Sequence, residues 1–244
     1  MNQQHETGSP SPDLTTQRQF WNTWNLRHRI APDMQSLRRG ETVVKLVAGL
    51  RRDAPRILEI GCSTGWLSKE LAKLGPVTGT DLANDVIEHA RTRVPEVRFV
   101  AGDFLELDLE DRPFDVVVSL EVLAHVRDKA LFCDRVADLL APGGHFVVTT
   151  QNRYVWERTA SLERPTEMLQ SFLSAGELRA LLRPRFQVLR FLTIIPAGDL
   201  GLLRVINSAK LNRALGAVVG RGTVTRAKEF LGFGNTLVVL AQKR

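Results

Sequence analysis

The sequence predicts an α/β fold in which a mostly parallel sheet of seven strands is covered by helices on both faces. Short apolar runs alternate with amphipathic stretches between about Leu37 and Asn152, a pattern typical of parallel strands joined by right-handed crossover helices. One run, "FDVVVSLEVL" (114–123), is rich in β-branched residues and poor in charge, as expected for a central strand buried on both faces. The length of 244 residues and the 43% hydrophobic content suit one soluble domain with a full core.

Five strands and their connecting helices follow one another in order along the first two thirds of the chain. The expected strands are "PRILEI" (55–60), "PVTGTDL" (76–82), "VRFVAGDF" (97–104), "FDVVVSLEVL" (114–123) and "APGGHFVVTTQN" (141–152). The expected helices lie at 37–52, 66–75, 84–94 and 129–140.

The remaining third of the chain predicts two final strands, "FQVLRFLTII" (186–195) and "NTLVVLAQKR" (235–244). The segment between them, 197–234, is too long for a hairpin and is expected to form a helical insertion. At the other end, residues 1–17 are polar and contain Ser, Pro and Gly, so we expect a disordered lead-in.

The stretch "LEIGCSTGWL" (58–67) resembles a nucleotide-binding turn that lacks its middle glycine. It follows the first strand and opens a helix, where open parallel sheets bind their ligands. A dinucleotide fingerprint that starts at Gly61 needs glycines where the chain has Ser63 and Trp66, and a P-loop also fails at Trp66. Asp81 follows Gly61 by twenty residues, the separation at which a second strand presents a carboxylate to ribose hydroxyls.

Asp103 and Phe104 follow the third strand. A carboxylate can accept a hydrogen bond from an exocyclic amine, and an aromatic ring can stack on a base. Together with Asp81, these side chains suit an adenosine group without phosphates.

Five stretches together resemble the class I S-adenosylmethionine-dependent methyltransferases, which have a Rossmann-like fold. They are "LEIGCSTG", "VTGTDLA", "GDF", "FDVVVSLEVLAHV" and "LLAPGGHFVVTTQNR", in that order across roughly 57–153. Within that family, "EVLAHV" and "TTQNR" are most similar to the ubiquinone-biosynthesis O-methyltransferases. The resemblance implies a methyltransferase that uses S-adenosylmethionine and releases S-adenosylhomocysteine.

The resemblance also implies a division of one methyltransferase domain, 18–244. Residues 18–53 would form an N-terminal helical cap and 54–153 the cofactor-binding core. Residues 154–244 would form the substrate side, with the helical insertion at 197–234.

Cofactor contacts implied by the resemblance cluster at the carboxyl ends of the first four strands. The methionine part would be wrapped by Gly61, Cys62, Ser63 and Gly65, in a turn that Glu59 would orient, and Arg38 would meet the carboxylate of the cofactor. Asp81 would bind the ribose, while Leu82 would pack near the adenine and Asp103 and Phe104 would contact it. Ser119 and Leu120 would offer backbone contacts near the sulfonium. Two alternatives stay open, because Phe104 can belong to the core only and Glu59 can merely cap the turn. Cys62 is expected to be a small filler rather than a nucleophile, since nothing nearby would activate it.

His125 is the expected catalytic residue, as a base for a phenol or hydroxyl acceptor, because it lies just past the fourth strand. A surface histidine at a helix start is the alternative. The related quinone enzymes carry a second carboxylate where this chain has Ala124. Glu121 and His125 alone are a poor site for a hard cation, so no metal is expected.

Substrate contacts are expected from two regions. Trp21 and Trp24 lie in an aromatic, amphipathic segment, 18–32, which either caps the sheet or closes over a ligand. Beyond the fifth strand, the expected contacts are Gln151, Asn152, Arg153 and Tyr154, with Trp156 as a further pocket wall.

The formal net charge of +6 is distributed unevenly, because no acidic residue lies between Asp199 and Glu229. This stretch is either a solvated basic face or a contact for an anionic substrate or a membrane surface. Two cysteines without a CxxC pair and the lack of a signal peptide indicate a cytoplasmic protein. The most apolar later stretch is interrupted by Arg190, Pro196 and Asp199, so no transmembrane helix is expected.

Three functions are compatible with these observations. The favoured one is methyl transfer to an oxygen or nitrogen of a small molecule, such as a phenolic, lipid-like or sugar acceptor. The second is methylation of RNA or protein, against which stands the lack of a nucleic-acid module, so no nucleic acid is expected as a partner. The third is a non-enzymatic cofactor-binding protein.

Overall fold

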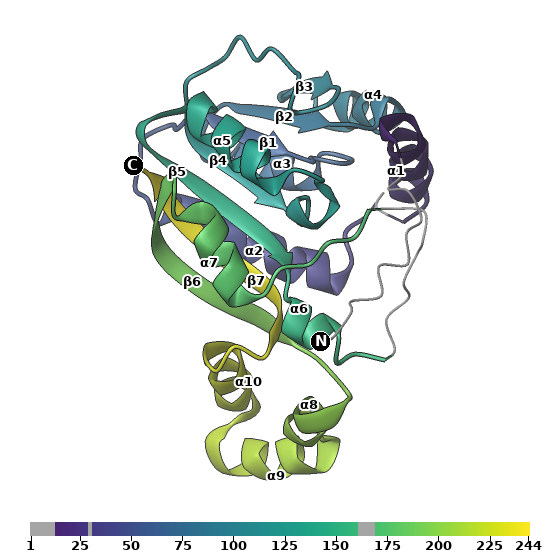
Figure 1. Cartoon of the computed structure of the whole chain (residues 1–244), viewed down its shortest axis with the longest axis vertical. Coiled ribbons are helices and arrows are strands. Elements are labelled where there is room, and N and C mark those ends of the chain that lie inside the picture. Colours follow the sequence, from purple (N-terminus) through teal and green to yellow (C-terminus); the bar gives the residue numbers. More distant parts are fainter. Residues whose placement is uncertain (1–12, 29–30, 161–168) are drawn as a thin grey trace, which may run out of the picture.

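The computed structural model describes residues 13–28, 31–160 and 169–244 and contains a seven-stranded sheet (Figure 1). The strands are β1 (Ile57–Ile60), β2 (Val77–Asp81), β3 (Arg98–Ala101), β4 (Phe114–Leu120), β5 (Leu140–Gln151), β6 (Phe186–Pro196) and β7 (Gly234–Lys243). Their order in the sheet is β3-β2-β1-β4-β5-β7-β6, and only β7 runs antiparallel to its neighbours. The predicted fold class is therefore confirmed.

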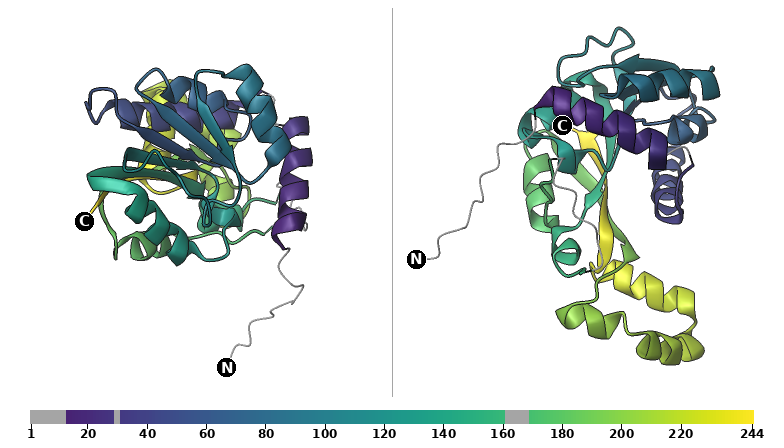
Figure 2. Two further views of the ribbon diagram at one scale, coloured as in Figure 1. Left: turned by 90° about the horizontal axis from the view of Figure 1, so that it is seen from above. Right: turned by 90° about the vertical axis from the view of Figure 1, so that its right-hand side faces the viewer.

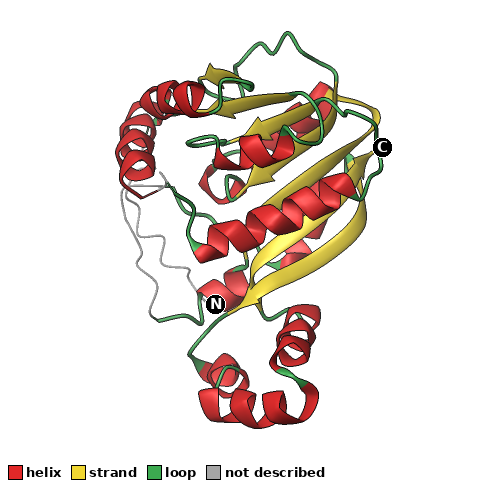
Figure 3. Ribbon diagram, turned by 180° about the vertical axis from the view of Figure 1, so that it is seen from behind, coloured by secondary structure: helices red, strands yellow, loops and turns green. Residues whose placement is uncertain are grey.

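Helices cover both faces of this sheet. Their bounds are α1 (Leu14–His28), α2 (Met34–Ala48), α3 (Trp66–Leu71), α4 (Asn84–Arg93), α5 (Lys129–Leu139), α6 (Arg153–Trp156), α7 (Ala175–Leu182), α8 (Gly201–Ile206), α9 (Ala209–Val219) and α10 (Arg221–Phe230), with one 3-10 turn at Leu123–His125. Figure 1 looks onto the face that α5 and α7 cover, and Figure 3 shows α2 crossing the opposite face.

Strand β4 shows why the sequence has so few charges at this point. Val117 packs into the core beneath α5 and α7, whereas Val116 and Val118 pack into the core beneath α2, α3 and α4. All three side chains are fully buried. The middle of a central strand with helices on both faces has no position left for a solvated side chain, and the one charged residue of β4, Asp115, lies near its start.

The N-terminal helix α1 begins at Leu14, four residues before the boundary that the sequence suggested. The Asp13 carboxylate accepts a hydrogen bond from the Thr16 amide at 2.7 Å, which stabilises the first turn. Residues 14–17 therefore belong to the helix, and 1–12 lie outside the described residues. At α4, the Asp85 amide donates to the Asn22 side chain at 3.1 Å and so anchors α1 against the domain.

The predicted helical insertion between the last two strands is confirmed. Helices α8, α9 and α10 follow β6 and lead back into β7. They project from the sheet as a separate arm, at the bottom of Figure 1 and of the right-hand view in Figure 2.

The turn between β1 and α3 depends on a buried contact. Ser68, on α3, donates its hydroxyl hydrogen bond to the carboxylate of Glu59 on β1. Burial, reinforced by the neighbouring Asp81 charge and opposed by the Ser68 bond, raises the pKa of Glu59 to about 8. Within the turn, Ser63 has a φ of +49°, a left-handed conformation that a glycine would adopt more easily.

Strands β6 and β7 approach each other closely at Gly234. A Cβ atom there would lie 2.4 Å from the Ile194 nitrogen and 2.5 Å from its carbonyl oxygen. These are backbone atoms in a sheet, so they cannot move aside as a flexible side chain can.

We expect Gly234→Ala to lower the free energy of unfolding by about 1–3 kcal/mol, the usual cost of overpacking. Denaturant unfolding would measure this loss. The matched control is Gly176→Ala, because a Cβ at Gly176 meets nothing within 4 Å. That variant should keep the stability of the parent or gain slightly from its better helix propensity. Equal stability of the two variants would contradict the close approach.

The raised pKa of Glu59 predicts a particular pH dependence of stability. Between pH of about 4.5 and about 8, the folded protein holds a proton on Glu59 that the unfolded chain has released. The free energy of unfolding should therefore fall with rising pH across this window, by up to about 1.4 kcal/mol per pH unit. Glu59→Gln, which keeps an acceptor for Ser68, should lack this contribution. Denaturant unfolding of both proteins without cofactor would reveal it, and parallel pH curves would contradict it.

Candidate functional site

A cavity of about 1100 Å³ opens at the carboxyl ends of β1, β2 and β4, beneath α1. Ile60 of β1 lies opposite Thr80 of β2 and Ser119 of β4, so these strand ends are level with one another. The predicted site residues that line the cavity are Trp21, Trp24, Glu59, Gly61, Cys62, Ser63, Asp81, Leu82, Asp103, Phe104, Leu120, His125 and Gln151. The volume slightly exceeds the usual range for one small ligand, so a cofactor and an acceptor can lie side by side.

Asp81 is the buried acid at the end of β2. One carboxylate oxygen accepts a hydrogen bond from the Ser63 amide at 2.9 Å, and the other accepts from the Ala83 amide at 3.0 Å. Burial raises the pKa of Asp81, while these backbone bonds lower it. The carboxylate is thus held in one orientation at the edge of the cavity, with lone pairs left for a ligand that donates hydrogen bonds.

The hydrogen bonds of the β1–α3 turn argue against a bound phosphate. Phosphate cradles direct free backbone amides at the anion. Here the Ser63 amide already donates to Asp81, and the amides of Gly61 and Cys62 both donate to the Thr80 carbonyl. Ser63 Oγ is buried, lines the cavity and lacks a partner among the described residues. The turn therefore offers a hydroxyl and a carboxylate, which fit a neutral or cationic group.

Cys62 is structural. Its side chain is buried, and burial with the nearby Asp81 and Glu59 charges raises the pKa of the thiol well above its ordinary value. The sulfur therefore stays protonated and is a poor nucleophile, in keeping with its expected role as a filler.

Asp103 and Phe104 follow β3 and line the cavity. The Asp103 carboxylate accepts from the Leu105 amide at 3.0 Å, which fixes its orientation. Phe104 is buried, and its ring centroid lies 5.2 Å from that of Phe132. Phe104 belongs to the hydrophobic core and also lines the cavity, so the two interpretations of this residue are compatible.

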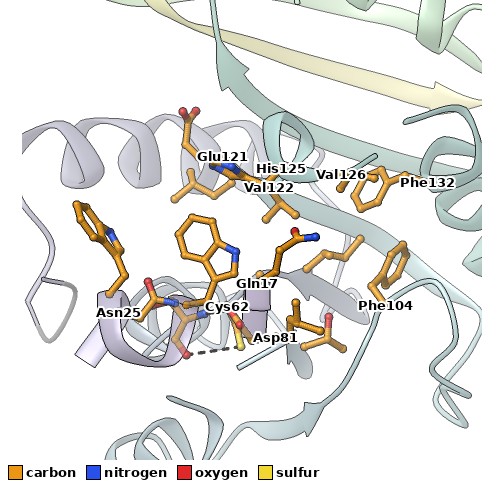
Figure 4. Close-up of a pocket in the computed structure, with 18 of the residues that line it drawn as sticks. Gln17, Asn25, Cys62, Asp81, Phe104, Glu121, Val122, His125, Val126 and Phe132 are labelled. Carbon is orange, nitrogen blue, oxygen red and sulfur yellow. Dashed lines mark hydrogen bonds between the residues drawn. The ribbon is translucent and has the colours of Figure 1, made fainter. Parts of the chain in front are cut away.

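His125 and Glu121 lie across the cavity from Cys62 and Asp81 (Figure 4). The His125 Nδ1 atom is 2.7 Å from the Leu169 carbonyl oxygen, and because a carbonyl only accepts, Nδ1 carries the proton. The Trp21 ring packs edge to face against the imidazole, with 4.8 Å between the two ring centroids. Burial lowers the pKa of His125, reinforced by Lys129 and opposed by the Leu169 bond. The imidazole is therefore neutral near pH 7, and Nε2 is free of a proton.

Glu121 has a φ of +62°, and the two oxygens of its carboxylate differ in their hydrogen bonding. Its Oε1 accepts from the Thr149 hydroxyl at 2.7 Å and lies 3.8 Å from Arg39 Nε. Its Oε2 is buried without a partner in the described part of the chain, and the same is true of Gln151 Oε1 and Asn235 Oδ1. All of these residues except Thr149 line the cavity. Three unpaired acceptors beside one guanidinium form a polar surface that suits a ligand rich in donors.

Six predicted site residues do not line the cavity, and two of them belong to the cofactor turn and β4. Gly65 caps α3 with a φ of +78° and packs against Phe99, so it shapes the turn without facing the ligand. Ser119 is fully buried within β4.

Arg38 is the third predicted site residue that does not line the cavity. Its side chain is half exposed and lies 3.8 Å from Glu229. The next residue, Arg39, is buried, donates to the Thr236 hydroxyl at 2.9 Å and lines the cavity. A shift of one residue on a helix moves a side chain by about 100° to another face, so "SLRRGE" could not reveal which arginine points inward.

The other three predicted site residues that do not line the cavity follow β5, and each contacts another residue of the fold. Asn152 caps α6 and donates to the carbonyls of Gly232 and Gly234, which ties the end of β5 to the start of β7. Arg153 is 2.9 Å from Glu177, and the Tyr154 ring lies beneath the Arg158 guanidinium. Trp156 does line the cavity, as expected.

Several lining residues were missed by sequence reasoning. Besides Arg39, Glu121 and Asn235, they include Gln17 and Asn25 of α1, and Trp66, whose ring covers Gly40 of α2. Asn235 and the α1 amides carry no sequence signal, because long-range packing alone brings them to the site. Trp66 carried a signal, since a bulky ring at the start of α3 must pack over the neighbouring helix.

Within the described ranges, no three His, Cys, Asp or Glu side chains gather in a way that could hold a metal ion. None of the described helices is both long and apolar enough to cross a membrane.

The sequence pattern of a family described as "Methyltransferase domain" matches residues 57–144. A probable S-adenosylmethionine-dependent methyltransferase of Mycolicibacterium smegmatis is 36% identical over 126 residues, which are 51% of this chain and 48% of that protein. A ubiquinone biosynthesis O-methyltransferase of Xylella fastidiosa is 34% identical over 145 residues, 52% of this chain and 58% of that protein. The chain thus spans about half the length of the curated relatives that it matches.

Solved structures share the fold over nearly the whole chain. The [4+2]-cyclase SpnF superposes with a TM-score of 0.66 at 20% identity, covering 97% of this chain and 99% of that one. The N-methyltransferase NodS of Bradyrhizobium japonicum, solved with S-adenosylhomocysteine, gives a TM-score of 0.63 at 16% identity, with 91% and 98% covered. At these identities the likeness concerns the fold alone. Residues 57–144 thus match the methyltransferase-domain family, and the whole chain resembles these solved structures in fold.

Proposed function

We propose that the chain transfers the methyl group of S-adenosylmethionine to an oxygen, or a nitrogen, of a small-molecule acceptor. The observation that carries the proposal is one continuous cavity lined both by Asp81 and Asp103 and by His125 and Glu121. The name of the Xylella relative supports an oxygen acceptor.

The cofactor half of the cavity comes from the ends of β1, β2 and β3. Asp81 would accept hydrogen bonds from the ribose hydroxyls, and Asp103 from the adenine amine, with Leu82 and Phe104 against the base. The turn from Gly61 to Ser63 would surround the methionine part. Arg39, rather than Arg38, is the guanidinium that the cavity offers to a carboxylate.

The acceptor half comes from the ends of β4, β5 and β7 and from α1. Glu121, Gln151 and Asn235 would accept hydrogen bonds from hydroxyl or amine groups of the acceptor, because their free oxygens are otherwise unpaired among the described residues. Trp21 and Trp24 would cover its apolar part. The lining by α1 favours the interpretation that this helix closes over a ligand.

His125 would act as the general base. Bound S-adenosylmethionine supplies an activated methyl group, so the protein has to align the acceptor and exclude water. The Leu169 carbonyl holds the Nδ1 proton, and Nε2 would take the proton from the acceptor hydroxyl. Trp21 restricts the rotation of the ring. The partner is a small molecule, and a covered cavity of this kind suits such an acceptor better than a nucleic acid.

Asp81→Ala should weaken the binding of S-adenosylhomocysteine at least about tenfold, because hydrogen bonds to a charged group contribute about 1.5–3 kcal/mol each. Isothermal titration calorimetry would measure this. Asp108→Ala is the matched control, since the Asp108 side chain is exposed and pairs with Arg112 at the surface. Unchanged affinity in Asp81→Ala would refute the ribose assignment, and no binding to the parent protein would refute the proposed function.

His125→Asn should lower kcat about 100-fold or more for a hydroxyl acceptor and leave S-adenosylhomocysteine affinity unchanged. The assay is S-adenosylhomocysteine formation with a panel of phenols, polyols and amines. Because burial lowers the pKa of His125, the rate of the parent enzyme should fall only below pH 6.5, as the base becomes protonated. His89→Asn, outside the cavity, is the control. A loss below a few-fold in His125→Asn would leave this residue a structural role.

A further inference from the structure

The arm formed by α8, α9 and α10 takes no part in the cavity described above. Neither α9 nor α10 contains a buried residue. Figure 1 and the right-hand view of Figure 2 show these helices beyond the end of the sheet. An arm of this kind has a surface that the fold itself does not need.

Exposed apolar side chains concentrate on this arm. Of the fifteen large hydrophobic side chains that are exposed in the described part of the chain, nine belong to it. They are Leu200, Leu202, Val205, Leu211, Leu215, Val218, Val219, Phe230 and Leu231. Val218 is 83% exposed and Phe230 is 91% exposed. Such a concentration on a soluble surface marks a place of contact.

The same arm is strongly basic. Six cations, and no acidic residue, lie between Asp199 and Glu229: Arg204, Lys210, Arg213, Arg221, Arg226 and Lys228. The structure gives none of the six an ion pair with another described residue. Arg213, Arg221 and Lys228 also line a second hollow of about 640 Å³ between the helices and the end of β6. Basic and exposed apolar residues therefore alternate along the arm.

The arm is held firmly in place. The Glu229 carboxylate accepts from the Ile195 amide at 3.2 Å, and Lys228 donates to the Asn207 side chain at 3.1 Å. Asn207 in turn donates to the carbonyls of Ala197 and Gly198. The arm therefore presents its surface in one orientation, and little ordering entropy would be lost on binding.

Charge and apolarity together select the partner. A second copy of this chain, docked by the same face, would set six cations against six cations. A nucleic acid would match the charge but would leave the apolar side chains without a partner. A bilayer with anionic lipids supplies both a negative surface and an apolar interior.

We propose that α8, α9 and α10 bind an anionic phospholipid bilayer, with the apolar side chains inserted at the lipid headgroup level and the cations on the phosphates. The hollow lined by Arg213, Arg221 and Lys228 receives a headgroup phosphate. The proposal does not depend on the methyl-transfer reaction.

Vesicle co-sedimentation of the full chain tests the proposal. We expect binding to vesicles of phosphatidylcholine with phosphatidylglycerol, a loss of binding at high salt, and weak binding to phosphatidylcholine alone. Arg213→Glu with Arg221→Glu, and separately Val218→Asp with Phe230→Asp, should each reduce binding at least about tenfold, because they remove the charge or the inserted groups.

The controls are Arg183→Glu and Leu131→Asp, which make the same changes at exposed positions outside the arm. Both should bind as the parent does. S-adenosylhomocysteine affinity should be the same in all variants, which verifies their folding and separates this test from that of the proposed function. The proposal would be overturned if the parent protein did not bind vesicles, or if all variants bound equally well. It would also be overturned if the parent protein were a dimer that only the substitutions in the arm convert to a monomer.

Discussion

The carboxylate of Asp81 is the point on which the architecture of the site depends. By accepting from the Ser63 and Ala83 amides, it joins the β1–α3 turn to the end of β2 and fixes the shape of both. A buried carboxylate is costly, and two backbone donors offset only part of that cost. A ligand that donates further hydrogen bonds to Asp81 therefore offsets more of that cost.

The two halves of the cavity are built by different kinds of contact. Short connections at the ends of β1, β2 and β3 make the cofactor half, so its geometry follows from local backbone hydrogen bonds. The acceptor half is assembled from α1, α2, β4, β5, β7 and the segment at 169–172, which are distant in the sequence. Substitutions in these distant segments can reshape that half of the cavity without disturbing the turn between β1 and α3.

This difference explains what the sequence could predict. The fold class follows from periodicity, and the structure confirms it. Motifs of a few residues predict Asp81, the turn at Gly61 and Phe104 as site residues, and all three line the cavity. The choice between Arg38 and Arg39 depends on the rotation of one helix, which a short motif does not encode. Asn235 reaches the cavity only because β7 pairs antiparallel with β5, a pairing that local sequence does not specify.

The arm and the acceptor half share a structural connection. Asn152, next to Gln151, donates to the carbonyls of Gly232 and Gly234, and Asn235 follows directly. The chain that leaves α10 therefore passes through the strand ends that carry two of the unpaired oxygens. Gln151 and Asn235 therefore lie beside the strand ends that these hydrogen bonds join, whereas Asp81 lies on β2, three strands away from β5. The arm is thus attached next to the part of the cavity that would hold the acceptor and away from the part that would hold the cofactor.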